Sequence, residues 1–86
     1  MKIVYIPVFM RQLSKLHPEF QKEVSEKIEL LKDVDNHKYL KVHKLRGRLR
    51  NRYSFSVNYQ TRIVFTYISK QEIALLAIGD HEVYDK

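Results

Sequence analysis

The apolar residues of this 86-residue chain change their spacing half-way along it, and this change most constrains the fold. In residues 8–34 apolar side chains recur every three or four positions, as in Phe20, Val24 and Ile28, which predicts helices. In residues 53–68 apolar and polar side chains alternate, which predicts strands with one buried face. Helices followed by a run of strands are typical of α+β domains.

A first strand and two short helices are expected in the N-terminal half. Residues 3–6 form a run rich in β-branched and aromatic side chains, and Pro7 ends it. A helix over residues 8–16 follows. Pro18 begins a second helix that continues to about residue 34, because proline suits the first turn of a helix. Both helices have one apolar side, so we expect them to form an αα-hairpin.

Three further strands are expected in the C-terminal half. They lie at residues 53–59, 62–68 and 73–78, with Gln60 and Thr61 in the first turn. The last strand is apolar on both faces, which places it in the interior of the sheet. The predicted fold is therefore α+β, in the order β-α-α-β-β-β: a small, antiparallel-rich sheet packed on one face by the αα-hairpin. It forms one domain over residues 1–86, and the pattern assigns no structure to residues 36–52.

The basic side chains are concentrated in one part of the chain. The net charge is +6, yet residues 1–35 are neutral and no acidic residue occurs between Asp35 and Glu72. The basic residues of this stretch are Lys38, Lys41, Lys44, Arg46, Arg48, Arg50, Arg52, Arg62 and Lys70. Because like charges repel, such a cluster favours a polyanionic partner, and nucleic acid is the usual one. The alternative is a solvated basic surface.

The composition also excludes several kinds of site. Without cysteine, the chain has no disulfide framework, no thiolate nucleophile and no cysteine-bound metal. The four histidines, His17, His37, His43 and His81, match no short metal-binding spacing, so we expect no metal. No motif predicts a cofactor. Neither a membrane-spanning run nor a signal peptide is present, so we expect a cytoplasmic protein without a membrane partner.

The strongest candidate for catalysis follows the last predicted strand, in the segment Gly79-Asp80-His81-Glu82-Val83-Tyr84. Cleavage of RNA by its own 2′-hydroxyl needs a base, an acid and a fixed cation. His81 exchanges a proton near neutral pH, since the ordinary pKa of histidine is about 6.5. Arg62 is the candidate cation, and Tyr84 offers a stacking surface for a nucleobase. His43 is the second candidate for proton transfer.

Each of these residues also has a structural interpretation. His81 can cap the end of a strand, and Arg62 can decorate the solvent face of its strand. Tyr84 can dock the C-terminus onto the core. Asp80 either orients His81 through a hydrogen bond or is an ordinary turn residue.

Four segments together carry a resemblance to a known family. They are Lys44-Leu45-Arg46-Gly47, Tyr53-Ser54-Phe55-Ser56-Val57-Asn58-Tyr59, Arg62-Ile63-Val64-Phe65 and Ile78-Gly79-Asp80-His81-Glu82-Val83-Tyr84. In their order and spacing the chain resembles the RelE/ParE superfamily of bacterial type II toxins, in particular its RelE and YafQ branches, over nearly its whole length. The resemblance implies a RelE-like fold, cleavage of messenger RNA in the ribosomal decoding site, and inhibition by a cognate antitoxin.

The resemblance also implies roles for individual residues. His81 resembles the C-terminal catalytic histidine of YafQ-like toxins, and His43 resembles an earlier functional histidine of that branch. Arg62 resembles the strand arginine with which RelE stabilises the transition state, and Tyr84 resembles its C-terminal aromatic residue. The residues that resemble those holding ribosomal RNA are Lys41, Lys44, Arg46, Arg48, Arg50 and Arg52.

The sequence departs from both branches at some positions. A second histidine and an aspartate of YafQ have no match, because Val57, Asn58 and Thr61 occupy that region. His81 stands near the place of the C-terminal arginine of RelE. The site is thus a hybrid of the two branches, and the assignment of acid and base stays open.

The expected function is that of a ribosome-dependent, metal-independent endoribonuclease toxin. Its expected partners are messenger RNA, small-subunit ribosomal RNA and an acidic antitoxin that covers the basic face between Lys38 and Arg62. Operator DNA is expected as a partner only through the antitoxin. One alternative is a ParE-like toxin that inhibits DNA gyrase without catalysis, and another is an inert relative that binds RNA or antitoxin only. The Gly-Asp-His-x-Val-Tyr ending favours the nuclease.

Overall fold

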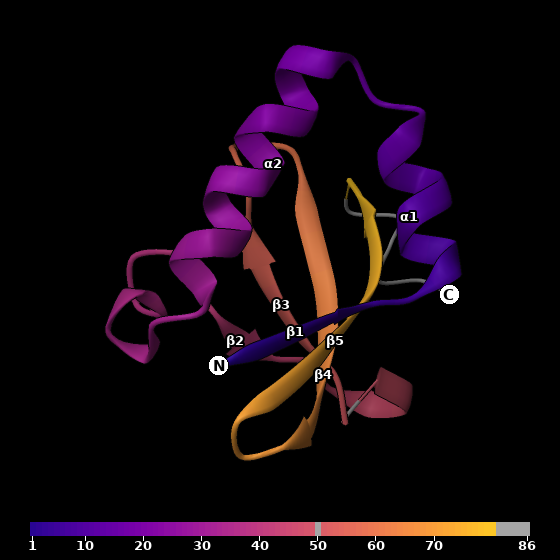
Figure 1. Cartoon of the computed structure of the whole chain (residues 1–86). Coiled ribbons are helices and arrows are strands. Elements are labelled where there is room, and N and C mark those ends of the chain that lie inside the picture. Colours follow the sequence, from indigo (N-terminus) through magenta and orange to yellow (C-terminus); the bar gives the residue numbers. More distant parts are fainter. Residues whose placement is uncertain (50, 81–86) are drawn as a thin grey trace.

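The computed structural model describes residues 1–49 and 51–80, in which two helices lie on one side of a five-stranded sheet (Figure 1). The elements are β1 (Lys2–Tyr5), α1 (Pro7–Ser14), α2 (Pro18–Leu31), η1 (Val34–Asn36), β2 (His43–Lys44), η2 (Gly47–Leu49), β3 (Tyr53–Ser56), β4 (Arg62–Ser69) and β5 (Glu72–Gly79). The sheet order is β1-β5-β4-β3-β2, with β1 parallel to β5 and the other neighbours antiparallel. The predicted α+β class and the antiparallel-rich sheet under an αα-hairpin are confirmed.

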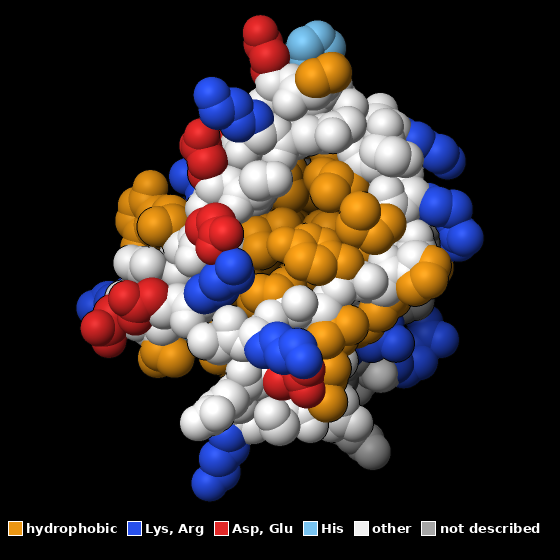
Figure 2. Space-filling model, viewed as in Figure 1, with side chains coloured by type: hydrophobic (Ala, Val, Ile, Leu, Met, Phe, Trp, Pro, Cys, Tyr) orange, Lys and Arg blue, Asp and Glu red, His pale blue; other side chains and the backbone are white. Residues whose placement is uncertain are grey.

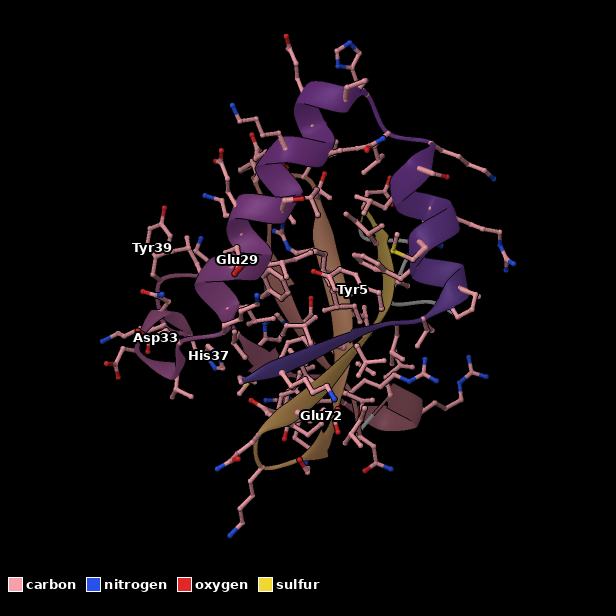
Figure 3. All side chains as sticks on the ribbon, in the orientation of Figure 1. Tyr5, Glu29, Asp33, His37, Tyr39 and Glu72 are labelled. Atoms are coloured by element: carbon pink, nitrogen blue, oxygen red, sulfur yellow. The ribbon has the colours of Figure 1, made fainter. Side chains whose placement is uncertain are left out.

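The two layers share one core. Its buried side chains come from both helices, from the helix-facing side of the sheet and, at Leu40, from the turn before β2: Phe9, Val24, Ile28, Leu31, Leu40, Phe55, Ile63, Phe65, Ile73 and Leu75. Strand β5 lies between β1 and β4, as its two apolar faces predict. The helices stand apart in Figure 1, and Figure 2 shows hydrophobic side chains in the gap between them. Tyr5 lies over the sheet in this region and packs against Phe9, with their ring centroids 6.0 Å apart (Figure 3).

Side chains fix both ends of α2. At its start, Nδ1 of His17 accepts a hydrogen bond from the backbone N–H of Glu19. The helix ends at Leu31 rather than near residue 34, because side chains that follow it bond to its last carbonyls. Nδ2 of Asn36 donates to the Leu30 carbonyl at 2.9 Å, and Nε2 of His37 donates to the Leu31 carbonyl at 2.8 Å. Figure 3 shows His37 close to this end of the helix.

Strand β3 ends at Ser56, three residues before the predicted boundary. The reason is Asn58, whose Oδ1 accepts hydrogen bonds from the backbone N–H groups of Gln60 and Thr61, each at 2.9 Å. Asparagine often bonds to its own backbone in this way and so starts a turn. The apolar–polar alternation continues through the turn and extends the predicted strand too far.

Residues 36–52, which the sequence left unassigned, contain a fifth strand, β2, and the short helices η1 and η2. Leu40 anchors this segment: its side chain is buried in the core, and its carbonyl accepts a hydrogen bond from the Ser56 N–H. Further along, the Leu45 N–H donates to the Arg52 carbonyl, and Oγ1 of Thr66 donates to the Asn51 carbonyl at 2.9 Å. The basic stretch is therefore attached to β3 and β4.

Candidate functional site

Two of the predicted catalytic residues, His43 and Arg62, lie on the side of the sheet that faces away from the helices. Side chains alternate between the two faces of a strand, and Phe55, Ile63 and Phe65 point toward the helices. Their neighbours in the strands point the other way. We call this side the outer face, and its residues are His43 on β2, Ser54 and Ser56 on β3, Arg62 and Val64 on β4, and Ala77 and Gly79 on β5.

Strand register fixes how far apart His43 and Arg62 lie. His43 pairs with Ser54, Ser54 pairs with Val64, and Arg62 is two residues from Val64. Two strand spacings and a two-residue offset separate their Cα atoms by about 12 Å. The two side chains can therefore contact one bound molecule from different sides.

His43 is exposed, and one hydrogen bond determines its protonation pattern. Its Nδ1 lies 3.0 Å from the carbonyl oxygen of Lys41. A carbonyl only accepts hydrogen bonds, so Nδ1 carries the proton. Nε2 is then the ring atom that can accept a proton from a ligand, and it can return that proton once it carries it.

Arg62 is half-buried and its guanidinium is held in place by the turn between β3 and β4. Nη1 donates to the carbonyls of Asn58 at 2.8 Å, Tyr59 at 3.1 Å and Thr61 at 3.2 Å. The turn is itself tied to α2, because Nδ2 of Asn58 donates to Oε1 of Glu23 at 3.1 Å. Arg62 is therefore a fixed cation on the outer face.

The C-terminal segment that contains the other candidate residues begins directly after β5, next to Arg62. Arg62, the first residue of β4, pairs with Gly79, the last residue of β5, so β5 ends beside Arg62. His81 and Tyr84 lie outside the described residues, as does Arg50 among the basic residues. Asp80 is exposed and makes an interaction of its own.

The remaining predicted RNA-binding residues lie on the edge strand β2 and in the segments on either side of it. Lys41, Lys44, Arg46, Arg48 and Arg52 are all exposed. Within residues 1–49 and 51–80, none of these five forms an ion pair with a carboxylate. Their charges are thus left to attract an anion from solution.

A pocket next to Arg62 is a feature that the sequence does not reveal. Its volume is about 430 Å³, and its lining includes Ile6, Val8, Gln12, Arg52, Val64, the last four residues of β5 and Asp80, which follows them. Oε1 of Gln12 accepts a hydrogen bond from the Ile78 N–H at 2.9 Å, which joins α1 to β5 at the pocket wall. The sequence also does not identify Asn58 as the residue that fixes the turn beside Arg62. The tendency of asparagine to start a turn is the only feature of the sequence that points to this role.

The part of the chain that the structure describes holds neither a metal cluster nor a membrane-spanning helix. No group of three His, Asp or Glu side chains within it is placed to hold a metal ion. No helix there is long and apolar enough to cross a membrane. Burial raises the pKa of Tyr67, on the helix-facing side, and the neighbouring Tyr53 raises it further.

The arrangement of these elements is shared with solved structures. No family model and no curated protein sequence matches the chain. YafQ from Escherichia coli BL21(DE3) matches it with a TM-score of 0.78 and 12% identity, over 95% of this chain and 94% of that one. The toxin–antitoxin complex RelBE2 from Mycobacterium tuberculosis matches with a TM-score of 0.74 and 17% identity, over 93% and 96% of the two chains. The YoeB–YefM complex from Staphylococcus aureus matches with a TM-score of 0.73 and 19% identity, over 94% and 97%.

The chain has the RelE-like toxin fold. The resemblance to the RelE and YafQ branches, predicted from the sequence motifs, is thereby confirmed at the level of the fold. The RelE-like fold here consists of the αα-hairpin on one side of the sheet and the outer face on the other. At these low identities the shared fold does not transfer an activity, so the activity has to be argued from the residues of the outer face.

Proposed function

We propose that this protein is the toxin of a type II toxin–antitoxin system and acts as a ribosome-dependent, metal-independent endoribonuclease. The observation that carries the proposal is the position of Arg62. Its guanidinium is fixed by three carbonyls, it shares the outer face with His43, and it lies beside the strand end that leads to His81. RNA cleavage by internal attack requires a fixed cation together with groups that take and give a proton, and the sequence offers His43 and His81 as candidates for those groups.

The reaction follows from these groups. One histidine takes the proton of the ribose 2′-hydroxyl, and the 2′-oxygen attacks the adjacent phosphorus. Arg62 stabilises the negative charge that gathers on the phosphate oxygens. The bond to the 5′-oxygen breaks, and the other histidine gives that oxygen a proton. The products are a 2′,3′-cyclic phosphate and a 5′-hydroxyl, and His43 and His81 are each candidates for either role.

The proposed partners follow from the charge of the surface. Lys41, Lys44, Arg46, Arg48 and Arg52 contact phosphates of small-subunit ribosomal RNA, together with Arg50. An acidic segment of a cognate antitoxin covers the same basic face and blocks access to it. Complexes among the solved structures of the same fold, RelBE2 and YoeB–YefM, support the presence of an antitoxin partner.

The test is cleavage of messenger RNA on programmed ribosomes, mapped by primer extension. General acid–base catalysis contributes roughly 10²- to 10⁴-fold to rates, so His81→Ala is expected to reduce cleavage by about that factor. Arg62→Lys keeps a positive charge but lacks the planar fork of donors, and it is also expected to cleave poorly. The matched control is His17→Asn, which removes an exposed histidine and keeps an acceptor at the start of α2.

Two results would count against the proposal. Cleavage by His81→Ala and His43→Ala at the native rate would exclude both histidines from the reaction. The absence of any cut by the native protein, together with inhibition of gyrase supercoiling, would instead support a ParE-like activity.

A further inference from the structure

The pocket beside Gly79 has the size and lining of a small-molecule site. Its volume of about 430 Å³ falls in the range of roughly 300–1,000 Å³ that is usual for ligand pockets. Its apolar lining includes Ile6 and Val8 at the start of α1 and Val64 on β4. These apolar side chains suit a flat, weakly polar ring such as a nucleobase.

Polar groups at the pocket would fix the orientation of such a ring. Because Oε1 of Gln12 is occupied by the Ile78 N–H, the amide is fixed in one orientation and Nε2 is its donor end. Nε2 can donate to a carbonyl oxygen or a ring nitrogen of a base. Arg52 is exposed at the same pocket, and its guanidinium can bind a phosphate or stack on a base.

The pocket adjoins Arg62. Val64 lies two residues from Arg62 on the same face of β4, about 7 Å away along the strand. Gly79, which pairs with Arg62, also lines the pocket. A base in the pocket would therefore have its own phosphate within reach of the fixed guanidinium.

From this geometry we propose that the pocket formed by Val8, Gln12, Arg52, Val64 and Gly79 binds one nucleobase of the RNA, next to the phosphate that Arg62 contacts. The proposal rests on the proposed nuclease function and deepens it, since a base-binding pocket beside the reacting phosphate selects the nucleotide at which the chain is cut. Gln12 is then a specificity-determining residue.

Two exposed positions of α1 make a matched pair for the test. Val8 lines the pocket and is 43% exposed, whereas Met10 is 45% exposed and is absent from the lining. Val8→Trp fills the pocket from its rim. Met10→Trp adds the same side chain to the same helix outside it, so it controls for any general effect of tryptophan on folding.

The first readout does not depend on ribosomes. Each of the four ribonucleoside 5′-monophosphates is titrated into the full-length protein, and backbone and side-chain amide shifts are followed by NMR. We expect at least one nucleotide to shift the Gly79 backbone amide and the Gln12 side-chain amide in the native protein and in Met10→Trp. Val8→Trp is expected to weaken this binding by roughly tenfold or more, which corresponds to about 1.4 kcal/mol.

The second readout is the nucleotide preference of cleavage on programmed ribosomes, in which Val8→Trp is expected to lose the native preference and Met10→Trp to keep it. Nucleotide-dependent shifts without any cleavage would support the pocket and overturn the nuclease. Normal cleavage by Val8→Trp with an unchanged nucleotide preference would overturn the pocket and leave the nuclease in place. Shifts confined to residues outside the pocket lining would also overturn it.

Discussion

Asn58 is expected to contribute to stability and to the position of Arg62 at the same time. Its side chain makes three hydrogen bonds, two within the turn and one to Glu23 of α2. A net hydrogen bond contributes about 0.5–1.5 kcal/mol, and these groups are exposed, so Asn58→Ala is expected to cost about 1–2 kcal/mol of unfolding free energy. For a domain of this size, each kcal/mol lowers Tm by about 4–8 °C. Thermal and urea unfolding, followed by circular dichroism, measure this loss.

The same variant is expected to impair cleavage beyond its effect on stability. Two of the three carbonyls that hold Nη1 of Arg62 belong to Asn58 and Tyr59, and the turn loses its fixed geometry when the Asn58 side chain is removed. Cleavage is therefore measured well below the Tm of Asn58→Ala, where the protein is fully folded. A slower rate there reflects a displaced guanidinium rather than unfolded protein.

Asn58→Asp separates the two kinds of contact. Aspartate keeps the Oδ1 acceptor for the turn but loses the donor to Glu23 and places two carboxylates side by side. Adding Glu23→Gln replaces one carboxylate by a group that can donate, so the double variant is expected to regain stability relative to Asn58→Asp. The hydrogen bonds of Asn58 do not hold the turn if the unfolding free energy of Asn58→Ala lies within about 0.5 kcal/mol of the native value. The same follows if adding Glu23→Gln to Asn58→Asp restores no stability.

Three other predictions test the core, the tyrosine with a displaced pKa and the basic segment. Leu40→Ala is expected to lower the unfolding free energy, measured by urea unfolding, by about 2–5 kcal/mol, because removing this buried side chain leaves a cavity in the core. The pKa of Tyr67 is higher in the folded than in the unfolded protein, so the unfolded protein loses this proton first as the pH rises past about 10. The free energy of unfolding therefore falls as the pH rises through this range. Tyr67→Phe is expected to reduce this fall, which urea unfolding midpoints measured from about pH 9 to 11 would show. Arg48→Gln is expected to reduce the salt dependence of RNA binding by about 0.7 in the log–log slope, whereas Arg11→Gln on the helix side leaves it unchanged.

The sequence predicts correctly those elements in which the spacing of apolar residues repeats within the element itself. Strand β3 alternates aromatic and serine side chains, and the apolar stripe of α2 extends over its length. Strand β2 is only two residues long, and both His43 and Lys44 are exposed, so it has no apolar period to detect. Its place in the sheet depends on pairing with β3 and on the anchoring of Leu40, which are tertiary interactions.

The geometry of the candidate site could not be predicted from the sequence for a related reason. Arg62 and His43 were recognised by their chemistry, but their common face follows from the register of three strands. The pocket is lined by residues of α1, by Arg52, by Val64 and by the end of β5, and the sequence of no single one of these segments predicts it. Gln12 looks like an ordinary polar residue of a helix until its bond to the Ile78 N–H is seen.

The hydrogen bonds of Arg62 suggest why an arginine suits this position. A guanidinium has five N–H donors in one plane, and the turn carbonyls engage only Nη1. Among the described residues, Nε and Nη2 make no hydrogen bond, so the edge that they form can bind a phosphate with two parallel donors. One side chain thus closes the turn and presents an anion-binding edge. Because the turn fixes the guanidinium before any substrate arrives, binding costs little reorganisation, and this is the condition under which a cation best stabilises a developing negative charge.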